Sequence, residues 1–274
     1  MQVDSVTKRL LFNTVRVDTQ LDDGGTGSGT AFVVEHAHRN TRHRFIVTNR
    51  HLVEGVSRGG LIFTQRRHGQ PLLGEHFHIG IDDFPQAWFM HPDPAVDLAV
   101  VPLRPLERAA QAQGVELYVQ PVDSADIGDA AALAGFDALE EVLFIGYPNG
   151  VWDQVNLTPI LRRGTTATPM ALDFEGRAEF LIDAAVYPGS SGSPVFALPG
   201  PRQRGGAPGE RRPLLVGVVA AVYFREEPHR LVAAPVPAHQ GGTVIGSEMI
   251  DLGLVIKAQA VLQAVQAYLG RWRE

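Results

Sequence analysis

The sequence of 274 residues contains no cysteine and only two lysines, Lys8 and Lys257. Without cysteine the chain has no disulfide framework, no thiolate zinc site and no cysteine nucleophile. Neither lysine stands in a Gly-Lys-Ser/Thr context, which excludes a P-loop nucleotide hydrolase. At this length the chain can bury a substantial core without such covalent or metal cross-links.

Long apolar runs are also missing. No run reaches the roughly 18 residues of a membrane-spanning helix. The first twelve residues lack the apolar stretch and small-residue cleavage site of a signal peptide, so we expect a cytoplasmic protein without a membrane partner. The formal net charge of −6 does not favour nucleic acid, and we expect no nucleic-acid partner.

Short apolar and β-branched segments, separated by 29 glycines and 19 prolines, make up most of the sequence. This pattern favours an all-β sandwich or barrel over βαβ units. One amphipathic helix is expected near the C-terminus, over 257–270. The stretches 199–213 and 225–242, rich in proline and polar residues, are predicted to be surface loops. Strands are predicted at 30–34, 44–48, 97–103, 142–146, 180–186, 194–198 and 214–224.

Three segments carry residue types suited to acyl transfer. His51 follows the strand-like stretch 45–48, Asp97 heads the stretch 97–103, and Ser191 lies in Gly189-Ser190-Ser191-Gly192. A serine hydroxyl needs an imidazole to take its proton, and the imidazole needs a carboxylate to fix its tautomer. Backbone N–H groups of Gly189 and Ser191 would stabilise the oxyanion.

Together these segments resemble trypsin-like serine peptidases, and among them the bacterial HtrA/Deg-type proteases. The matching stretches are 25–32, 46–51, 183–194, 215–218 and 252–256, in the family order of His, Asp and Ser. An α/β-hydrolase would place its serine first, in Gly-x-Ser-x-Gly, so that class is excluded. No PDZ domain is expected after Leu269.

The resemblance implies two packed antiparallel six-stranded β-barrels and a C-terminal α-helix. The first barrel would span residues 1–115 and carry His51 and Asp97. The second, with Ser191, would belong to a domain at 116–274 closed by the helix 257–270. The implied activity is endopeptidase action on a protein or peptide substrate through an acyl-enzyme, with no cofactor and no metal.

The same resemblance places the floor of the specificity pocket at Ala185. An alanine there offers no charge, so a small or aliphatic residue before the scissile bond is expected. Val219, Ala220 and Ala221 would line the substrate strand and pair with an extended peptide. Asp183 is left open between pocket support and an ordinary buried hydrogen-bonding group.

Ser190 departs from the family, which carries Asp or Asn immediately before the nucleophile. The loop around it is therefore expected to be held differently, or to become ordered only in an active state. Because a cytoplasmic protease must be restrained, we also expect control by a regulatory protein partner, a homo-oligomer or that ordering step. A catalytically silent peptide-binding module and an esterase with the same triad stay open as alternatives.

Several other acidic, histidine and arginine side chains can be explained by structural roles as well as by functional ones. Asp93 and Asp123 are lesser candidates for the orienting carboxylate. The pairs His36/His38 and His76/His78 each share a strand face and permit metal ligation, although exposed hairpins have the same pattern. The arginines at 202, 204, 211 and 212 are interpreted as a solvated loop, because no aromatic residues interleave with them.

Overall fold

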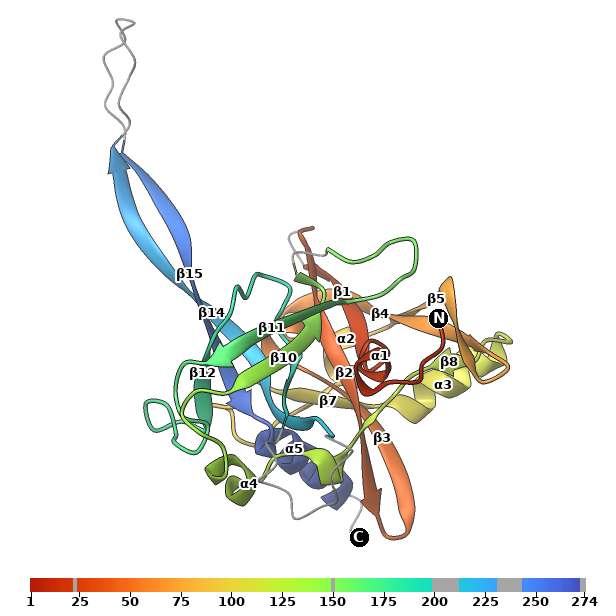
Figure 1. Cartoon of the computed structure of the whole chain (residues 1–274). Helices are drawn as coiled ribbons and strands as arrows, with labels where there is room; N and C mark the ends of the chain where they lie inside the picture. The colour runs from red at the N-terminus through yellow and green to blue at the C-terminus, as the bar shows by residue number, and fades with distance from the viewer. Residues whose placement is uncertain (22–23, 149–150, 199–211, 231–242, 272–274) are drawn as a thin grey trace, which may run out of the picture.

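The computed structural model describes residues 1–21, 24–148, 151–198, 212–230 and 243–271 and is mostly β (Figure 1). The strands of the first half are β1 (Thr14–Leu21), β2 (Thr26–His38), β3 (Thr41–Thr48), β4 (Val56–Arg67), β5 (Gln70–Ile81), β6 (Phe89–Met90), β7 (Ala99–Pro102), β8 (Leu117–Tyr118) and β9 (Val122–Asp123). Its helices and 3-10 turns are α1 (Val6–Leu10), η1 (Arg50–Leu52), α2 (Phe84–Ala87), α3 (Leu103–Ala112) and η2 (Ser124–Asp126).

The first half forms one nine-stranded sheet in the order β5-β4-β1-β2-β3-β7-β6, with β8 added to β4 and β9 to β2. In the described residues this hydrogen-bonded path does not close, so the predicted six-stranded barrel is corrected to a larger curved sheet. The short strands β8 and β9 extend this sheet past the predicted boundary at 115/116, which itself stays a prediction.

The central strands of this sheet are apolar on both faces. In β2, Ala31 and Val33 belong to one buried cluster, whereas Phe32 and Val34 belong to another. Side chains alternate across a strand, so a sheet covered on both sides needs a continuous apolar run. This explains why the stretches at 30–34 and 44–48 carry such a strong strand signal.

The second half contains the predicted six-stranded barrel. Its strands close in the order β10-β11-β12-β15-β14-β13. These strands are β10 (Glu141–Gly146), β11 (Ile160–Thr166), β12 (Glu179–Asp183), β13 (Pro194–Ala197), β14 (Leu214–Arg230) and β15 (Thr243–Lys257). The helices of this half are α4 (Ala130–Ala134) and α5 (Gln259–Gly270), the second of which confirms the expected C-terminal helix.

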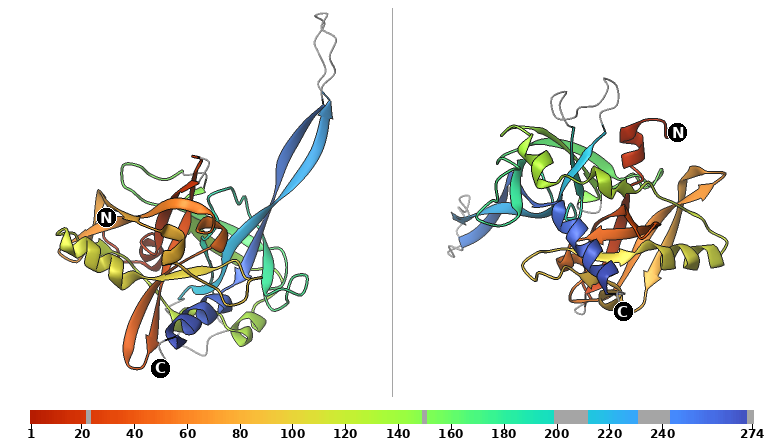
Figure 2. Two further views of the ribbon diagram at one scale, coloured as in Figure 1. Left: turned by 180° about the vertical axis from the view of Figure 1, so that it is seen from behind. Right: turned by 90° about the horizontal axis from the view of Figure 1, so that it is seen from below.

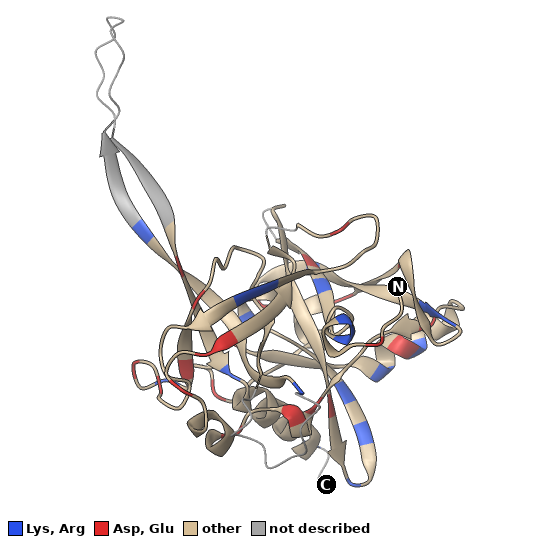
Figure 3. Cartoon of the chain, in the orientation of Figure 1, with Lys and Arg blue, Asp and Glu red and all other residues tan. Residues whose placement is uncertain are grey.

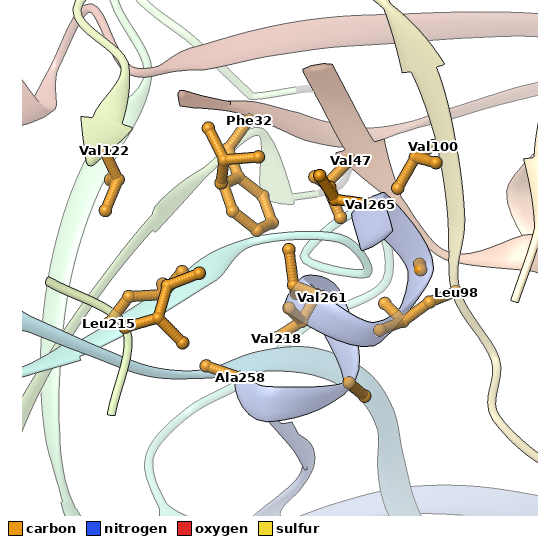
Figure 4. Close-up of a cluster of buried hydrophobic side chains, with 14 of the residues drawn as sticks. Phe32, Val47, Leu98, Val100, Val122, Leu215, Val218, Ala258, Val261 and Val265 are labelled. Atoms are coloured by element: carbon orange, nitrogen blue, oxygen red, sulfur yellow. The ribbon is translucent and has the colours of Figure 1, made fainter. Parts of the chain in front are cut away.

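The cluster that contains Phe32 and Val34 joins the two halves and buries one face of α5 (Figure 4). Phe32 and Val47 of the sheet meet Val218 of the barrel and Val261 and Val265 of the helix. At the end of α5 the Tyr268 ring also packs edge-on against rings of the first half. The helix therefore holds the sheet against the barrel and fixes the two halves relative to each other.

Strands β14 and β15 continue beyond the barrel as a two-stranded arm, which projects from the body in every view (Figures 1 and 2). Residues 225–230, predicted to be loop, therefore belong to a strand. The rest of that predicted loop, 231–242, and most of the other, 199–211, lie outside the described residues. Among the helices of the described part, none is long and apolar enough to span a membrane.

Candidate active site

His51 lies in the single turn η1, which begins two residues after β3 ends. Its imidazole Nδ1 is 2.6 Å from Asp97 Oδ2, and its backbone N–H donates to Asp97 Oδ1 at 2.9 Å. Both oxygens of one carboxylate are thus directed at one residue. This places the ring proton on Nδ1 and leaves Nε2 as the basic nitrogen, with about half of the side chain exposed.

Asp97, where the sequence predicted a strand to begin, lies in the loop two residues before the start of β7. Its carbonyl accepts from the buried Asn49 side chain at 2.8 Å. Arg50 donates to the carbonyls of His91 and Pro94, at 2.9 and 3.0 Å. The two residues that precede His51 therefore hold the loop that carries its carboxylate partner.

Ser191 follows a tight turn made by Tyr187-Pro188-Gly189-Ser190. The Ser190 N–H donates to the Tyr187 carbonyl at 3.0 Å, and Gly189 has φ 87°. These features define a type II turn, in which proline suits the second position and glycine the third. The Pro-Gly pair thus dictates the backbone path that leads into the nucleophile.

Two backbone donors in this loop are left unpaired. Among the described residues, neither the N–H of Gly189 nor that of Ser191 donates to an acceptor, although the N–H groups of Ser190, Gly192 and Ser193 all do. An oxyanion hole requires such pre-positioned free donors. Gly189 and Ser191 are the two residues that the sequence predicted for it.

Thr30 of β2 fastens this loop to the first half. Its N–H donates to the Ser191 carbonyl at 3.0 Å, and its hydroxyl donates to the Gly189 carbonyl at 3.2 Å. The same hydroxyl accepts from the N–H of Tyr147 at 3.1 Å. Because Thr30 is fully buried, water does not compete for these bonds. Ser190, by contrast, is buried with no partner for its hydroxyl in the described part of the chain.

Gly192 completes the loop at φ 83°, a conformation that favours glycine. A side chain here would overlap the Thr30 carbonyl and approach Thr48 Oγ1 to 2.7 Å. The nucleophile loop is therefore pressed against the end of β3, three residues before His51. In this way the fold brings Ser191 to the edge of the sheet that carries the imidazole.

The Ser191 hydroxyl makes one weak contact, a 3.5 Å approach to the Ala220 carbonyl. No hydrogen bond joins it to His51 in the described residues, a looseness that is common in such sites without substrate. Val219 exchanges backbone bonds with the loop, to Gly192 and Ser193, both at 2.9 Å. The predicted substrate strand, Val219 to Ala221, thus begins directly beside the nucleophile.

Ala185, the predicted pocket floor, lies half-buried at the centre of a narrow turn, where the Val186 N–H donates to the Ala184 carbonyl at 2.6 Å. Asp183, at the end of β12, is exposed and pairs in register with Thr165. The ordinary buried role considered for Asp183 is therefore wrong. Among the described residues, the Asp183 carboxylate makes no contact that would support the pocket.

An arginine that the sequence analysis did not single out packs against the turn 187–190 from the barrel side. The Arg162 guanidinium lies 5.0 Å from the ring centre of Tyr187 and 5.2 Å from that of Phe144. Its Nη1 is buried without an acceptor among the described residues. Burial lowers the pKa of this guanidinium, and the charges of Tyr187 and Asp251 oppose the shift. Thr30 and Arg162 therefore hold the turn from opposite halves.

The two lesser carboxylates do not contact His51. Asp93 accepts the Ala95 N–H at 2.9 Å, and Asp123 pairs with Arg42 at 3.0 Å. Basic residues of the β2–β3 hairpin, visible in Figure 3, have acidic neighbours of this kind. Burial, chiefly, lowers the pKa of His36, and nearby His38 and His43 lower it further.

Metal ligation was considered for the two histidine pairs. Among the residues that the structure describes, no three His, Asp or Glu side chains gather closely enough to hold a metal ion. The His36 ring nitrogen Nδ1 instead lies 2.9 Å from Ser124 Oγ. Three of the four loop arginines, at 202, 204 and 211, lie outside the described residues.

Sequence reasoning missed the residues that hold the site together. Thr30 was noted only as part of a strand, and Arg162 not at all. A buried threonine next to a glycine-rich stretch gives no local signal, because its role depends on contacts with residues 147 and 189–191. Asn49 and Arg50 were more accessible to prediction, since they are the two residues before the histidine.

Comparisons with known proteins agree with this arrangement. The family model of the trypsin-like peptidase domain matches residues 29–200, more than half of the chain, including His51, Asp97 and Ser191. No curated protein sequence matches the chain. The solved structures described below share 10–13% identity with this chain and bear on the fold alone.

Among solved structures, the one described as GrC shares 12% identity over 97% of this chain and 96% of its own, with a TM-score of 0.51. A thermostable serine protease from an extremophilic microorganism shares 13% identity over 94% of this chain and 97% of its own, at TM-score 0.46. The protease Anisep from Arthrobacter nicotinovorans shares 10% over 90% of both, also at 0.46.

Proposed function

The chain belongs to the trypsin-like peptidase domain family and is a serine protease by class, and from this premise we propose a specific mechanism. In it Ser191 attacks the peptide carbonyl while His51 Nε2 takes its proton, and Asp97 holds the imidazole and stabilises its charged form. The N–H groups of Gly189 and Ser191 bind the oxyanion. Water then releases the acyl group, and no cofactor takes part.

One observation carries this proposal. A single short loop presents Ser191 together with two N–H groups that have no acceptor among the described residues, and this loop packs closely against Thr30 and against Thr48, at the strand end before His51. A protein that only binds peptides has no need for donors aimed at a developing oxyanion. The turn is formed here without a carboxylate at Ser190, which supports a loop that is held in place by other groups.

Within this proposal the uncharged Ala185 favours a small or aliphatic residue before the scissile bond. The same proposal includes three further points. The protein is similar to the HtrA/Deg-type proteases, it is located in the cytoplasm, and a partner protein or a homo-oligomer restrains its activity. Interspersed acidic and basic side chains (Figure 3) and the net charge of −6 support a protein substrate over nucleic acid.

A fluorescent fluorophosphonate tests the proposal on purified protein. We expect wild-type protein to be labelled and mass spectrometry to place the label on Ser191. Labelling should be lost in Ser191→Ala and His51→Ala and kept in Ser193→Ala, a matched control because the Ser193 hydroxyl has no partner in the described residues. Folded wild-type protein that stays unlabelled would support the silent binding module. Faster turnover of a small ester than of a matched peptide would support the esterase.

A further inference from the structure

A cavity of about 540 Å³ lies where the N-terminal helix α1 meets the second half of the molecule. Its described lining comes from residues 4–10, from residues 120–126, and from the barrel at β13 and the residues just before β14. None of His51, Asp97 and Ser191 lines it, so the cavity is separate from the candidate active site. Its volume falls within the range of about 300–1,000 Å³ that is usual for small-molecule sites.

The inner wall of this cavity is apolar. Leu10, Val122 and Phe196 line it, and all three side chains are buried. They belong to the cluster that joins the two halves, in which Figure 4 labels Val122. The apolar part of a ligand would therefore lie against the shared core of the sheet and the barrel.

Three carboxylates also line the cavity, and none of them is without a partner. Lys8 Nζ donates to Asp4 Oδ1 at 2.6 Å, and Arg42 donates to Asp123 Oδ2 at 3.0 Å. Asp126 is engaged in an interaction of its own. The negative charges of the lining are thus already used within the protein.

The positive charges of the lining are not used in this way. Arg9 of α1 and Arg212, two residues before β14, are both exposed. In the part of the chain that the structure describes, neither side chain makes a hydrogen bond or an ion pair. A guanidinium presents several donors in a planar fork that suits carboxylate and phosphate groups. Because the two arginines come from different halves, an anion that contacts both would bridge them.

We propose that this cavity binds a small organic anion, in which a carboxylate or a phosphate is attached to an apolar body. The anionic group contacts Arg9 and Arg212, and the apolar body lies against Leu10 and Phe196. This inference goes beyond the proposed function, because the binding uses no catalytic group. The bound anion stabilises the contact between the two halves, on which the approach of Ser191 to His51 depends.

Two fluorescent probes test the inference on the wild-type protein. Anilinonaphthalene sulfonate is an anion on an apolar body, and phenylnaphthylamine has the same rings without the sulfonate. We expect the anionic probe to bind one site at least about tenfold more tightly than the neutral probe, because only the anion pairs with the arginines. Equal affinity for the two probes, or no binding of the anionic one, would overturn the inference.

Glutamine variants locate the site. Arg9→Gln and Arg212→Gln should each weaken binding of the anionic probe by about fivefold or more, and the double variant should bind it no better than the neutral probe. Arg108→Gln is the matched control, because Arg108 is an exposed arginine of α3 that does not line the cavity. It should stay within about twofold of wild type. Wild-type affinity in the double variant would contradict the proposal.

A substitution at Val6 tests the site without removing an arginine. Val6 lines the cavity and is 38% exposed, so the fold should tolerate a change there. Val6→Asp adds a negative charge and should abolish binding of the anionic probe, with little effect on the neutral one. Val6→Thr keeps the shape of the side chain and should bind both probes like wild type. Unchanged binding of the anion by Val6→Asp would place its site elsewhere.

Competition distinguishes the possible acidic groups. Octanoate and octyl phosphate share an apolar chain, and whichever displaces the anionic probe more strongly identifies the preferred group, whereas octanol should displace it weakly. Saturating octanoate or octyl phosphate should also raise the melting temperature by at least about 2 °C in the wild type and not in the double arginine variant. Displacement by octanol to the same extent, or an equal temperature rise in both proteins, would overturn the inference.

Failure of this inference is distinguishable from failure of the proposed function. Ser191→Ala should bind the anionic probe like wild type, since Ser191 does not line the cavity. A probe that is released when the fluorophosphonate labels Ser191 occupies the active site, which overturns the inference and keeps the function. A wild type that binds the probe as expected but is never labelled keeps the inference and loses the function.

Discussion

The two halves of the molecule hold their parts of the active site by different means. The sheet of the first half supplies His51 and Asp97, which are positioned by side chains: two carboxylate oxygens, the Asn49 amide and the Arg50 guanidinium. The barrel of the second half supplies Ser191, whose loop is shaped by backbone conformation at Gly189 and Gly192. Side-chain hydrogen bonds therefore position the base, whereas backbone conformation shapes the loop that carries the nucleophile.

This difference predicts different sensitivities. In the first half, a change that keeps the shape of a side chain but alters its hydrogen bonding should reduce activity. In the second half, adding a single methyl group to the backbone of the loop should lower activity more than the removal of a nearby hydroxyl. Five substitutions, from the largest expected effect to the smallest, test the comparison.

Gly192→Ala should abolish activity and lower the stability of the fold. Its new methyl group would overlap the Thr30 carbonyl at a φ of 83°. Thermal unfolding and fluorophosphonate labelling measure the two effects. Gly176→Ala is the control, because Gly176 has a similar φ of 74° with open space around it. Equal effects of both substitutions would mean that backbone strain, and not the close approach, matters.

Asp97→Asn should lower kcat by about 10³–10⁴-fold with little change in the fold, because the amide no longer fixes the Nδ1–H tautomer of His51. Steady-state kinetics on a short peptide measure the loss. Asp93→Asn, in the same loop, should stay within about twofold of wild type, since Asp93 only accepts the Ala95 N–H. A comparable loss in both variants would assign the effect to the loop as a whole.

Thr30→Val should lower kcat by about tenfold and leave KM nearly unchanged. It keeps the shape of the side chain but removes the donor to the Gly189 carbonyl and leaves the Tyr147 N–H unpaired. Thr30→Ser restores the hydroxyl and should recover most of the rate. If serine fails to rescue, packing of the lost methyl group is the cause.

Arg162→Met should lower kcat by less than Thr30→Val, about twofold to fivefold. It removes the cation over the Tyr187 ring but also the buried, unpaired Nη1, so the melting temperature should hold or rise. Kinetics and calorimetry together separate these effects. A larger loss than in Thr30→Val would show that the barrel side dominates in holding the turn.

Glu179→Gln should have the smallest effect, on stability alone. Burial raises the pKa of Glu179, with a smaller contribution from the Asp97 charge across the two halves and an opposing one from Arg177. A carboxyl with a raised pKa in the folded state lowers stability as pH rises from its ordinary pKa to the raised one, and the full cost remains at higher pH. Glutamine should therefore raise the melting temperature at pH 8, by at most about 3 °C, and change it little at pH 4. An equal effect at both pH values would contradict this explanation.

Local patterns in the sequence predict the strands and the chemical groups well. The runs at 30–34 and 44–48 become β2 and β3, and the periodicity after Lys257 becomes α5. The Pro-Gly pair before Ser190 specifies a type II turn by itself. These features depend on neighbours in the sequence, which is why they are readable from it.

Features that depend on distant residues were harder to predict. The sequence analysis did not name β1, β4 and β5 as strands, and in the described residues the first sheet does not close as a six-stranded barrel. Residues 225–230, polar and containing Pro228, have a loop composition but lie in β14 because β15 pairs with them. Propensity is a weak guide where a partner strand satisfies the backbone.

The sequence by itself determined the order of the three catalytic candidates, the glycines around Ser191 and the absence of cysteine chemistry, because composition and spacing fix these directly. Only the tertiary structure decided that Asp97, and neither Asp93 nor Asp123, faces His51, and that the Thr30 side chain contacts the nucleophile loop. Each of these depends on the approach of segments far apart in the chain. That approach follows from burial of the core shared by the sheet, the barrel and α5.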